Sequence, residues 1–171
     1  MYADYNDQTN QTLVNILGSF LRQLLTTVPE PIPDEVTTKL NDIHHGGRKV
    51  ETEDTLALLR IRLHQLQRTF ICIDAVDELE PDVRFQLLKV LKELGTNYTT
   101  RLFLTGRGHM ESEVQNCFHL TERYTTVISA SQQDIQEFVR QKIKGDRNLA
   151  AIDEVLAKDI VDAITEMSQG M

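Results

Sequence analysis

The fold is decided by residues 70–79, which read Phe70-Ile71-Cys72-Ile73-Asp74-Ala75-Val76-Asp77-Glu78-Leu79. Four consecutive apolar residues are typical of a strand that is buried on both faces, as in a parallel sheet. Asp74 then stands at the carboxyl end of this strand, and open α/β sheets bind their ligands at that edge. The stretch therefore predicts an α/β domain with an acidic ligand-binding edge, and we expect Cys72 to be a buried, reduced thiol.

Three carboxylates, those of Asp74, Asp77 and Glu78, fall within five positions. A lone acid after a strand is more often a turn residue or a helix N-cap. Carboxylates this close repel one another unless a cation or several hydrogen-bond donors share them, so we favour a functional cluster. We expect Asp74 to hold Mg²⁺ that bridges phosphate oxygens, and Asp77 or Glu78 to polarise an attacking water.

A second apolar run, residues 101–105, predicts a neighbouring strand, and Arg107 follows it closely. Parallel neighbours would bring Arg107 to the same edge as Asp74, where a guanidinium can bind a terminal phosphate. The alternative is a loop arginine paired with a surface acid. No Gly-x-x-x-x-Gly-Lys-Ser/Thr sequence occurs in these 171 residues, so the loop that usually cradles the phosphates is not among them.

Composition excludes several classes of protein. A net charge of −8 with scattered basic residues argues against a nucleic-acid-binding surface. Every apolar run is shorter than a membrane span, and no secretion leader precedes the first helix, so we expect a cytoplasmic protein without a membrane partner. Two cysteines are too few for a disulfide framework.

Apolar spacing and turn residues predict an alternation of helices and strands, which is typical of parallel sheets. The first helix, with Asp7, Thr9 or Asn10 as its N-cap, has its last apolar position at Leu25, and the proline-rich residues 29–33 end it. Thr52 is the expected cap of the third helix, and Gly95 the expected stop of the fourth. The predicted helices cover residues 13–25, 33–43, 52–66, 81–94, 131–143 and 149–164, and the predicted strands cover 2–5, 69–74, 101–105 and 124–128.

Several of these segments resemble the NACHT and nephrocystin-like N-terminal nucleotide-binding domains of fungal signal-transduction ATPases. Residues 70–78 resemble the family's Walker B segment, Asp-Gly-x-Asp-Glu after a hydrophobic strand, with Ala75 in place of the glycine. Residues 102–107 resemble its sensor strand, which often ends in Thr-Ser-Arg. Residues 6–25 are similar to the segment after its second strand, residues 134–139 to a short motif after its fifth, and residues 168–171 to the start of its Gly-Met-Phe-Leu-Trp element.

The resemblance implies a three-layer α/β fold of the P-loop NTPase type, with a parallel sheet ordered 5-1-4-3-2 and a C-terminal helical tail. Residues 1–145 would form a partial nucleotide-binding domain, and residues 146–171 the start of a helical subdomain. The family's first strand and its Walker A loop lie upstream of the position of Tyr2, so we expect an incomplete sheet that lacks the first strand.

In intact relatives, the resemblance implies Mg²⁺ with ATP or GTP as cofactors of a signalling switch. Asp74 would organise the metal, Asp77 and Glu78 the hydrolytic water, and Arg107 would sense phosphate. Without the lysine-bearing loop, we expect nucleotide to bind this chain weakly or not at all and hydrolysis to be impaired.

Two other functions remain open. The chain could be a non-catalytic interaction module that pairs with full-length receptors, or with itself, through its open sheet. It could also be a phosphoacceptor receiver-like domain built on Asp4, Asp7, Asp74 and Thr105. That class needs a lysine after the last strand, where this sequence has residues 128–130, Ile-Ser-Ala.

Overall fold

The structure is a computed structural model that describes residues 1–26, 31–119, 124–145 and 152–168. It divides into two compact units, Met1–Thr125 and Thr126–Met171. The division falls before the expected boundary at residue 146, because helix α6 (Gln132–Lys144) packs against α7 (Glu154–Met167) in the second unit. Each unit is described by itself below.

The first unit contains a small parallel sheet. Strand β1 (Thr69–Ile73) pairs with β2 (Thr100–Leu104) in a register that runs from Thr69↔Thr100 to Ile73↔Leu104. These two strands confirm the predicted pair. On the other side of β1, Tyr2 forms a parallel bridge with Asp74, whose backbone N–H donates to the Met1 carbonyl at 2.9 Å. The spatial order is therefore N-terminal segment, β1, β2.

The predicted strand over residues 2–5 is reduced to that single bridge. The Asp4 side chain accepts a hydrogen bond from the Asn6 N–H and turns the chain into a short 3-10 helix at Tyr5–Asp7. A second 3-10 helix, Val76–Glu78, follows β1, and a third, Gly108–Met110, follows β2. Both of the later turns lie at the carboxyl ends of the strands.

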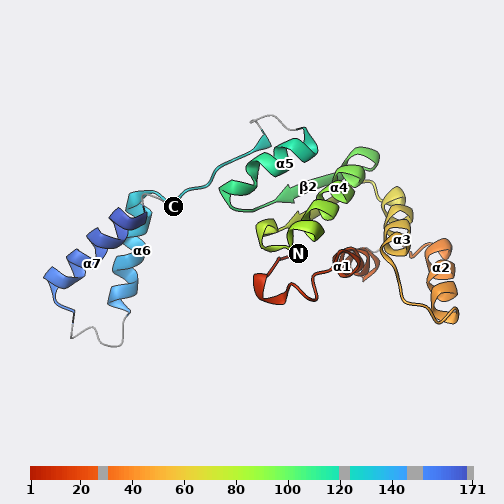
Figure 1. The fold of residues 1–171 in the computed structure, drawn as a ribbon, viewed down its shortest axis with the longest axis horizontal. Helices are drawn as coiled ribbons and strands as arrows, with labels where there is room; N and C mark the ends of the chain where they lie inside the picture. The colour runs from red at the N-terminus through yellow and green to blue at the C-terminus, as the bar shows by residue number, and fades with distance from the viewer. Residues whose placement is uncertain (27–30, 120–123, 146–151, 169–171) are drawn as a thin grey trace. The chain divides into compact units, whose positions relative to one another are not determined.

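The described part of this unit contains five α-helices (Figure 1): α1 (Leu13–Thr26), α2 (Asp34–His45), α3 (Thr52–Gln65), α4 (Pro81–Asn97) and α5 (Glu111–Phe118). Helix α1 packs on α3 and α4, and α4 packs on β2. The core is made of aliphatic side chains from these elements that are almost fully buried, among them Leu17, Leu58, Leu59, Ile73, Leu87, Leu91 and Leu94. Fully burying one such side chain stabilises the fold by about 1.5–3 kcal/mol.

The two faces of the sheet differ, so the expectation of a strand buried on both faces is wrong. Ile71 and Ile73 face the core, whereas Phe70 and Phe103 on the opposite face are 67% and 64% exposed. Successive side chains of a strand point to opposite faces, and only one face here is covered by the helices of the unit. Cys72 lies on the uncovered face and is exposed, which corrects the prediction of a buried thiol.

The predicted strand over residues 124–128 is absent: Tyr124 has a 3-10 helical conformation, and residues 125–130 have no regular structure. Val127 and Ile128 are 79% and 91% exposed. The run is rich in strand-forming side chains, but strand propensity mainly reflects packing against a neighbouring strand and a covered face, and this segment has neither.

The residues that start or stop three of these helices differ from those predicted. Helix α1 begins at Leu13, where the Thr12 hydroxyl oxygen accepts from the Asn15 N–H at 3.4 Å, rather than after the expected N-caps. Glu51 precedes α3 as its N-cap, and its N–H donates to the Asp54 carboxylate at 3.0 Å. Helix α4 continues past Gly95 to Asn97, and the Tyr98 N–H closes its last turn by donating to the Leu94 carbonyl at 3.2 Å.

The second unit is a pair of helices. The predicted N-cap of α6 is confirmed: the Ser131 hydroxyl oxygen accepts from the Asp134 N–H at 3.1 Å, and the Asp134 carboxylate accepts from the Ser131 N–H at 3.0 Å. Asp153 caps α7 by accepting from the Leu156 N–H at 2.8 Å. The predicted start of the last helix at residue 149 and the family-like residues 169–171 lie outside the described residues. No helix in the described ranges combines the length and the apolar character that a membrane crossing requires.

Candidate functional site

The backbone after β1 turns sharply at Ala75. This residue has φ 56° and ψ 46°, one of two positive φ values among the described non-glycine residues. The left-handed conformation costs a residue with a Cβ about 1–2 kcal/mol. Two hydrogen bonds from β2 hold it: the Ala75 N–H donates to the Thr105 hydroxyl at 2.9 Å, and the Val76 N–H donates to the Thr105 carbonyl at 2.9 Å.

Thr105 also fixes Asp74. While its hydroxyl oxygen accepts from Ala75, the hydroxyl donates its own proton to Asp74 Oδ1. Threonine has one hydroxyl donor and acceptor lone pairs, so both roles can be filled at once. The strand-end hydroxyl of β2 is therefore the direct link between the two strands at the site. Sequence analysis placed Thr105 beside Asp74 only in the receiver-like alternative, and it gave this hydroxyl no role in the nucleotide site.

Asp77 holds the loop that carries Arg107. Its Oδ1 accepts from the Arg107 N–H at 3.3 Å, and its Oδ2 lies 3.4 Å from Arg107 Nε. The Asp77 side chain is only 5% exposed, whereas that of Arg107 is 74% exposed. A Cβ at Gly106 would lie 3.2 Å from Val76 Cγ1 and 3.4 Å from Asp77 Oδ1, so the absence of a side chain there permits the close approach of the two loops.

Glu78 joins a third segment to the site. One oxygen, Oε2, accepts from the Tyr5 N–H at 3.0 Å, and Oε1 lies 3.8 Å from an Arg107 terminal nitrogen. On the far side of the acidic turn, Arg84 of α4 donates to the Leu79 carbonyl at 3.0 Å and pairs with Glu113 of α5 at 3.2 Å. Sequence analysis missed this arginine, because nothing in the spacing connects α4 to the turn.

The structure thus brings Asp74, Asp77, Glu78 and Arg107 to one edge of the sheet, at the carboxyl ends of β1 and β2. Their expected roles in metal binding, water activation and phosphate sensing stay predictions. Among the residues described, no three or more His, Cys, Asp or Glu side chains are grouped closely enough to hold a metal ion. Asp74 alone still suits Mg²⁺, which commonly uses one or two carboxylates and takes its other ligands from water and phosphate oxygens.

The acids that suggested a receiver-like domain serve local turns instead. Asp4 accepts from the Asn6 N–H at 2.9 Å, and Asp7 accepts from the Asn10 side-chain amide at 2.6 Å. Each carboxylate is thus engaged within its own segment.

Comparison with known proteins places this site within a family. Residues 1–107 match the family described as Nephrocystin 3, N-terminal. No curated protein and no solved structure matches the chain. The matched span covers more than half of the 171 residues and includes β1, β2 and all four site residues, ending at Arg107. The chain therefore belongs to the nephrocystin 3 N-terminal family.

Proposed function

We propose that the edge formed by Asp74, Thr105, Asp77 and Arg107 is the metal-binding and phosphate-sensing part of a nucleotide-dependent signalling switch of the NACHT type. One observation carries the proposal: the Asp74 carboxylate and the Arg107 guanidinium follow adjacent parallel strands and lie at the same edge. The Thr105 hydroxyl donates to Asp74, and Asp77 pairs with Arg107. Asp74 would hold Mg²⁺ on ATP or GTP, and the metal would neutralise phosphate charge.

Arg107 is the part of this edge that can change partner. Its contacts to Asp77 and Glu78 are long, 3.4 and 3.8 Å, and its side chain is mostly exposed. Only the Glu78 pair is of the partly exposed kind that contributes about 0–1 kcal/mol. The Asp77 carboxylate is buried, but it keeps the hydrogen bond from the Arg107 backbone N–H when the guanidinium moves. A hydrogen bond to a charged group is worth about 1.5–3 kcal/mol, so a phosphate oxygen can draw the guanidinium away from the two carboxylates.

That exchange would connect phosphate to the N-terminal segment. Glu78 holds the Tyr5 N–H as well as Arg107, and Asp77 holds the Arg107 backbone. A guanidinium that leaves both carboxylates changes the charge around the 3-10 turn Val76–Glu78 and the segment bonded to it. We assign Asp77 and Glu78 to hydrolysis in intact relatives, and to anchoring Arg107 between nucleotide-binding events.

The same proposal extends to the architecture. The spatial order of the N-terminal segment, β1 and β2 fits the last three strands of a 5-1-4-3-2 sheet, read in reverse. The family's first strand would then pair with the free edge of β2, and a second helical layer would cover Phe70 and Phe103. Because no Walker A sequence occurs in these 171 residues, we expect this chain to bind Mg-ATP weakly and not to hydrolyse it on its own.

Saturation-transfer NMR with ATP and Mg²⁺ tests the phosphate-sensing role. We expect a weak transfer signal that falls several-fold in Arg107→Gln, because the guanidinium supplies the phosphate contact. Arg101→Gln is the matched control, since Arg101 is also exposed but lies within β2. Equal signals from both variants would show that Arg107 does not sense phosphate.

The uncovered sheet favours a second candidate, a non-catalytic interaction module. One face of the sheet carries three exposed aromatic residues, Tyr2, Phe70 and Phe103. Phe70, Cys72 and Asp74 alternate along the chain and so share this face, Tyr2 is paired with Asp74, and Phe103 is paired with Cys72. A partner such as a full-length receptor could add a strand to β2 and cover these rings. The test is binding to such a receptor. A loss of binding in Phe103→Asp, together with unchanged binding in the double variant Asp74→Asn, Arg107→Gln, would favour the interaction module over the switch.

A further inference from the structure

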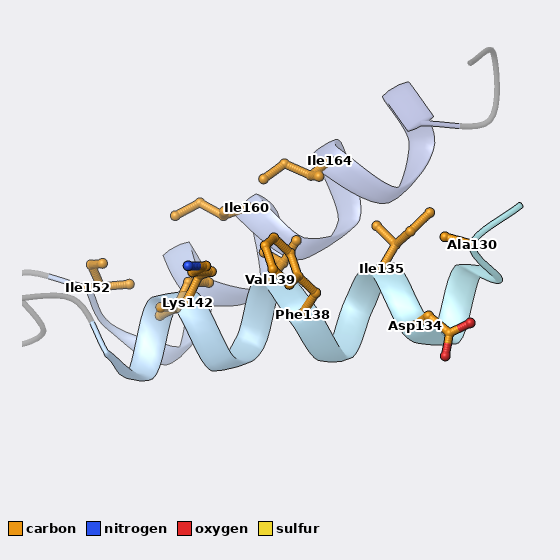
Figure 2. A pocket seen from close by; sticks show the side chains of 10 residues that line it. Ala130, Asp134, Ile135, Phe138, Val139, Lys142, Ile152, Ile160 and Ile164 are labelled. Atoms are coloured by element: carbon orange, nitrogen blue, oxygen red, sulfur yellow. The ribbon is translucent and has the colours of Figure 1, made fainter. Parts of the chain in front are cut away.

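The second unit carries an apolar groove that the nucleotide proposal does not use. The groove has a volume of about 770 Å³ and runs along α6 and α7 (Figure 2). Its apolar lining includes Ile135, Phe138, Val139 and Ile143 of α6 and Ile160 and Ile164 of α7. Figure 2 shows Phe138 and Val139 near the middle of the groove, with Ile160 and Ile164 projecting from the opposite helix.

The two helices bury little of their apolar surface against each other. Among the described residues of this unit, Val139 and Val161 are the buried apolar side chains, while Phe138 is 60% exposed. Helices of 13 and 14 residues gain most of their stability from packing an amphipathic face, not from helix propensity. This pair therefore needs an apolar surface that covers the groove.

The charges on α6 indicate what that surface is. Asp134, Phe138 and Lys142 lie four residues apart, so they form one stripe along the helix. All three line the groove, with the acid near the start of the helix and the lysine near its end. Lys142 Nζ lies 5.4 Å from the centre of the Phe138 ring.

This stripe is complementary to itself when a second α6 runs in the opposite direction. Asp134 and Lys142 are equally far in sequence from Phe138. A two-fold axis at Phe138 therefore places each Asp134 opposite the Lys142 of the other copy, with the two rings between the charge pairs. A closed two-fold contact uses the same surface on both partners and requires this kind of pattern.

We propose that the groove is a self-association surface, and that its occupant is the α6–α7 pair of a second copy of this chain. The two helix pairs form an antiparallel four-helix bundle around Phe138, Val139, Ile160 and Ile164. The apolar side chains supply the affinity, and the Asp134–Lys142 pairs fix the antiparallel orientation and exclude the parallel one. This contact is separate from the acidic edge and from the exposed face of the sheet.

The test is a charge swap in the full 171-residue chain, followed by sedimentation equilibrium. We expect the unaltered chain to dimerise, and Asp134→Lys and Lys142→Asp each to raise the dimer dissociation constant at least 10-fold by opposing like charges. An equimolar mixture of the two variants should recover the dimer, because each new lysine then meets a new aspartate. A variant that had lost its fold could not be rescued in this way.

Three further variants serve as controls for the test. Glu137→Lys makes the same change in charge at an exposed α6 position that does not line the groove, and dimerisation should persist. Phe138→Ala should weaken the dimer at least 10-fold without touching the N-cap, while Phe85→Ala on α4 should not. A monomeric unaltered chain would overturn the proposal. So would an equimolar mixture of the two charge variants that stays monomeric. Dimerisation that depends on Phe103 of the sheet, and not on Phe138, would also overturn it.

Discussion

Replacing Ala75 by glycine should make the protein more stable, although it removes a methyl group. Ala75 has a left-handed backbone, with φ 56°, which costs a residue with a Cβ about 1–2 kcal/mol. Glycine adopts this conformation freely but loses about 0.5–1 kcal/mol more conformational entropy on folding. Ala75→Gly keeps the N–H that donates to Thr105. The expected net gain is therefore about 0.7 kcal/mol, within a range of about 0–1.5 kcal/mol.

Thermal unfolding followed by circular dichroism measures this gain. For a chain of this length, 1 kcal/mol corresponds to a shift in Tm of about 2–4 °C, so we expect a rise of about 1–3 °C. Ala57→Gly, inside α3, is the matched control and should lower stability by about 0.5–1 kcal/mol. If both substitutions lower the Tm equally, the left-handed turn after β1 is refuted, and with it the geometry of the acidic edge.

Three further predictions concern side chains at the sheet and on α6. Thr105→Val removes the hydroxyl that serves Ala75 and Asp74 and should destabilise the chain by about 1–2 kcal/mol in urea unfolding, whereas Thr105→Ser should retain most of the stability. Cys72 should react with iodoacetamide before Cys117, because Cys72 is exposed and burial raises the pKa of the Cys117 thiol. Mass spectrometry of peptides after brief alkylation would show the order of labelling. Earlier labelling of Cys117 would contradict the uncovered face of the sheet. Hydrogen bonds from Ser131 lower the pKa of Asp134 below its ordinary value of 3.8, so the carboxylate stabilises α6 above that pH and loses this effect as the pH falls through its folded-state pKa. Asp134→Asn should abolish that part of the acid-induced loss of helical circular dichroism. An unchanged acid transition would disprove the capping role.

The parts of the fold that sequence predicted best are those decided by local pattern. The strand pair at Thr69 and Thr100 has apolar runs of the right length, and Pro81 and Ser131 mark the starts of their helices through backbone chemistry. The paired strands also brought Asp74 and Arg107 to one edge, since side chains that follow adjacent parallel strands share that edge.

The errors arose where tertiary contacts decide the outcome. Cys72 lies in an apolar run, but its exposure depends on whether helices cover that face of the sheet. Gly95 is of a residue type that often ends a helix, yet it lies within α4, whose buried leucines hold the helix against the core. The run that ends at Ile128 has strand propensity and no neighbouring strand. The role of Thr105 could not be predicted from sequence, because its hydroxyl reaches Asp74 and the Ala75 N–H only through the sharp backbone turn at Ala75.

The most direct test of the nucleotide-switch proposal is paramagnetic broadening of the ¹⁵N-labelled chain by Mn²⁺-ATP, with Mn²⁺ standing in for Mg²⁺. The account predicts that the backbone amide signals of Asp74, Thr105 and Arg107 broaden first, and that Asp74→Asn removes this selectivity while Asp82→Asn, at the start of α4, does not. Broadening that begins at other carboxylates, or that is the same in Asp74→Asn, would contradict the claim that this edge receives a metal-bound phosphate.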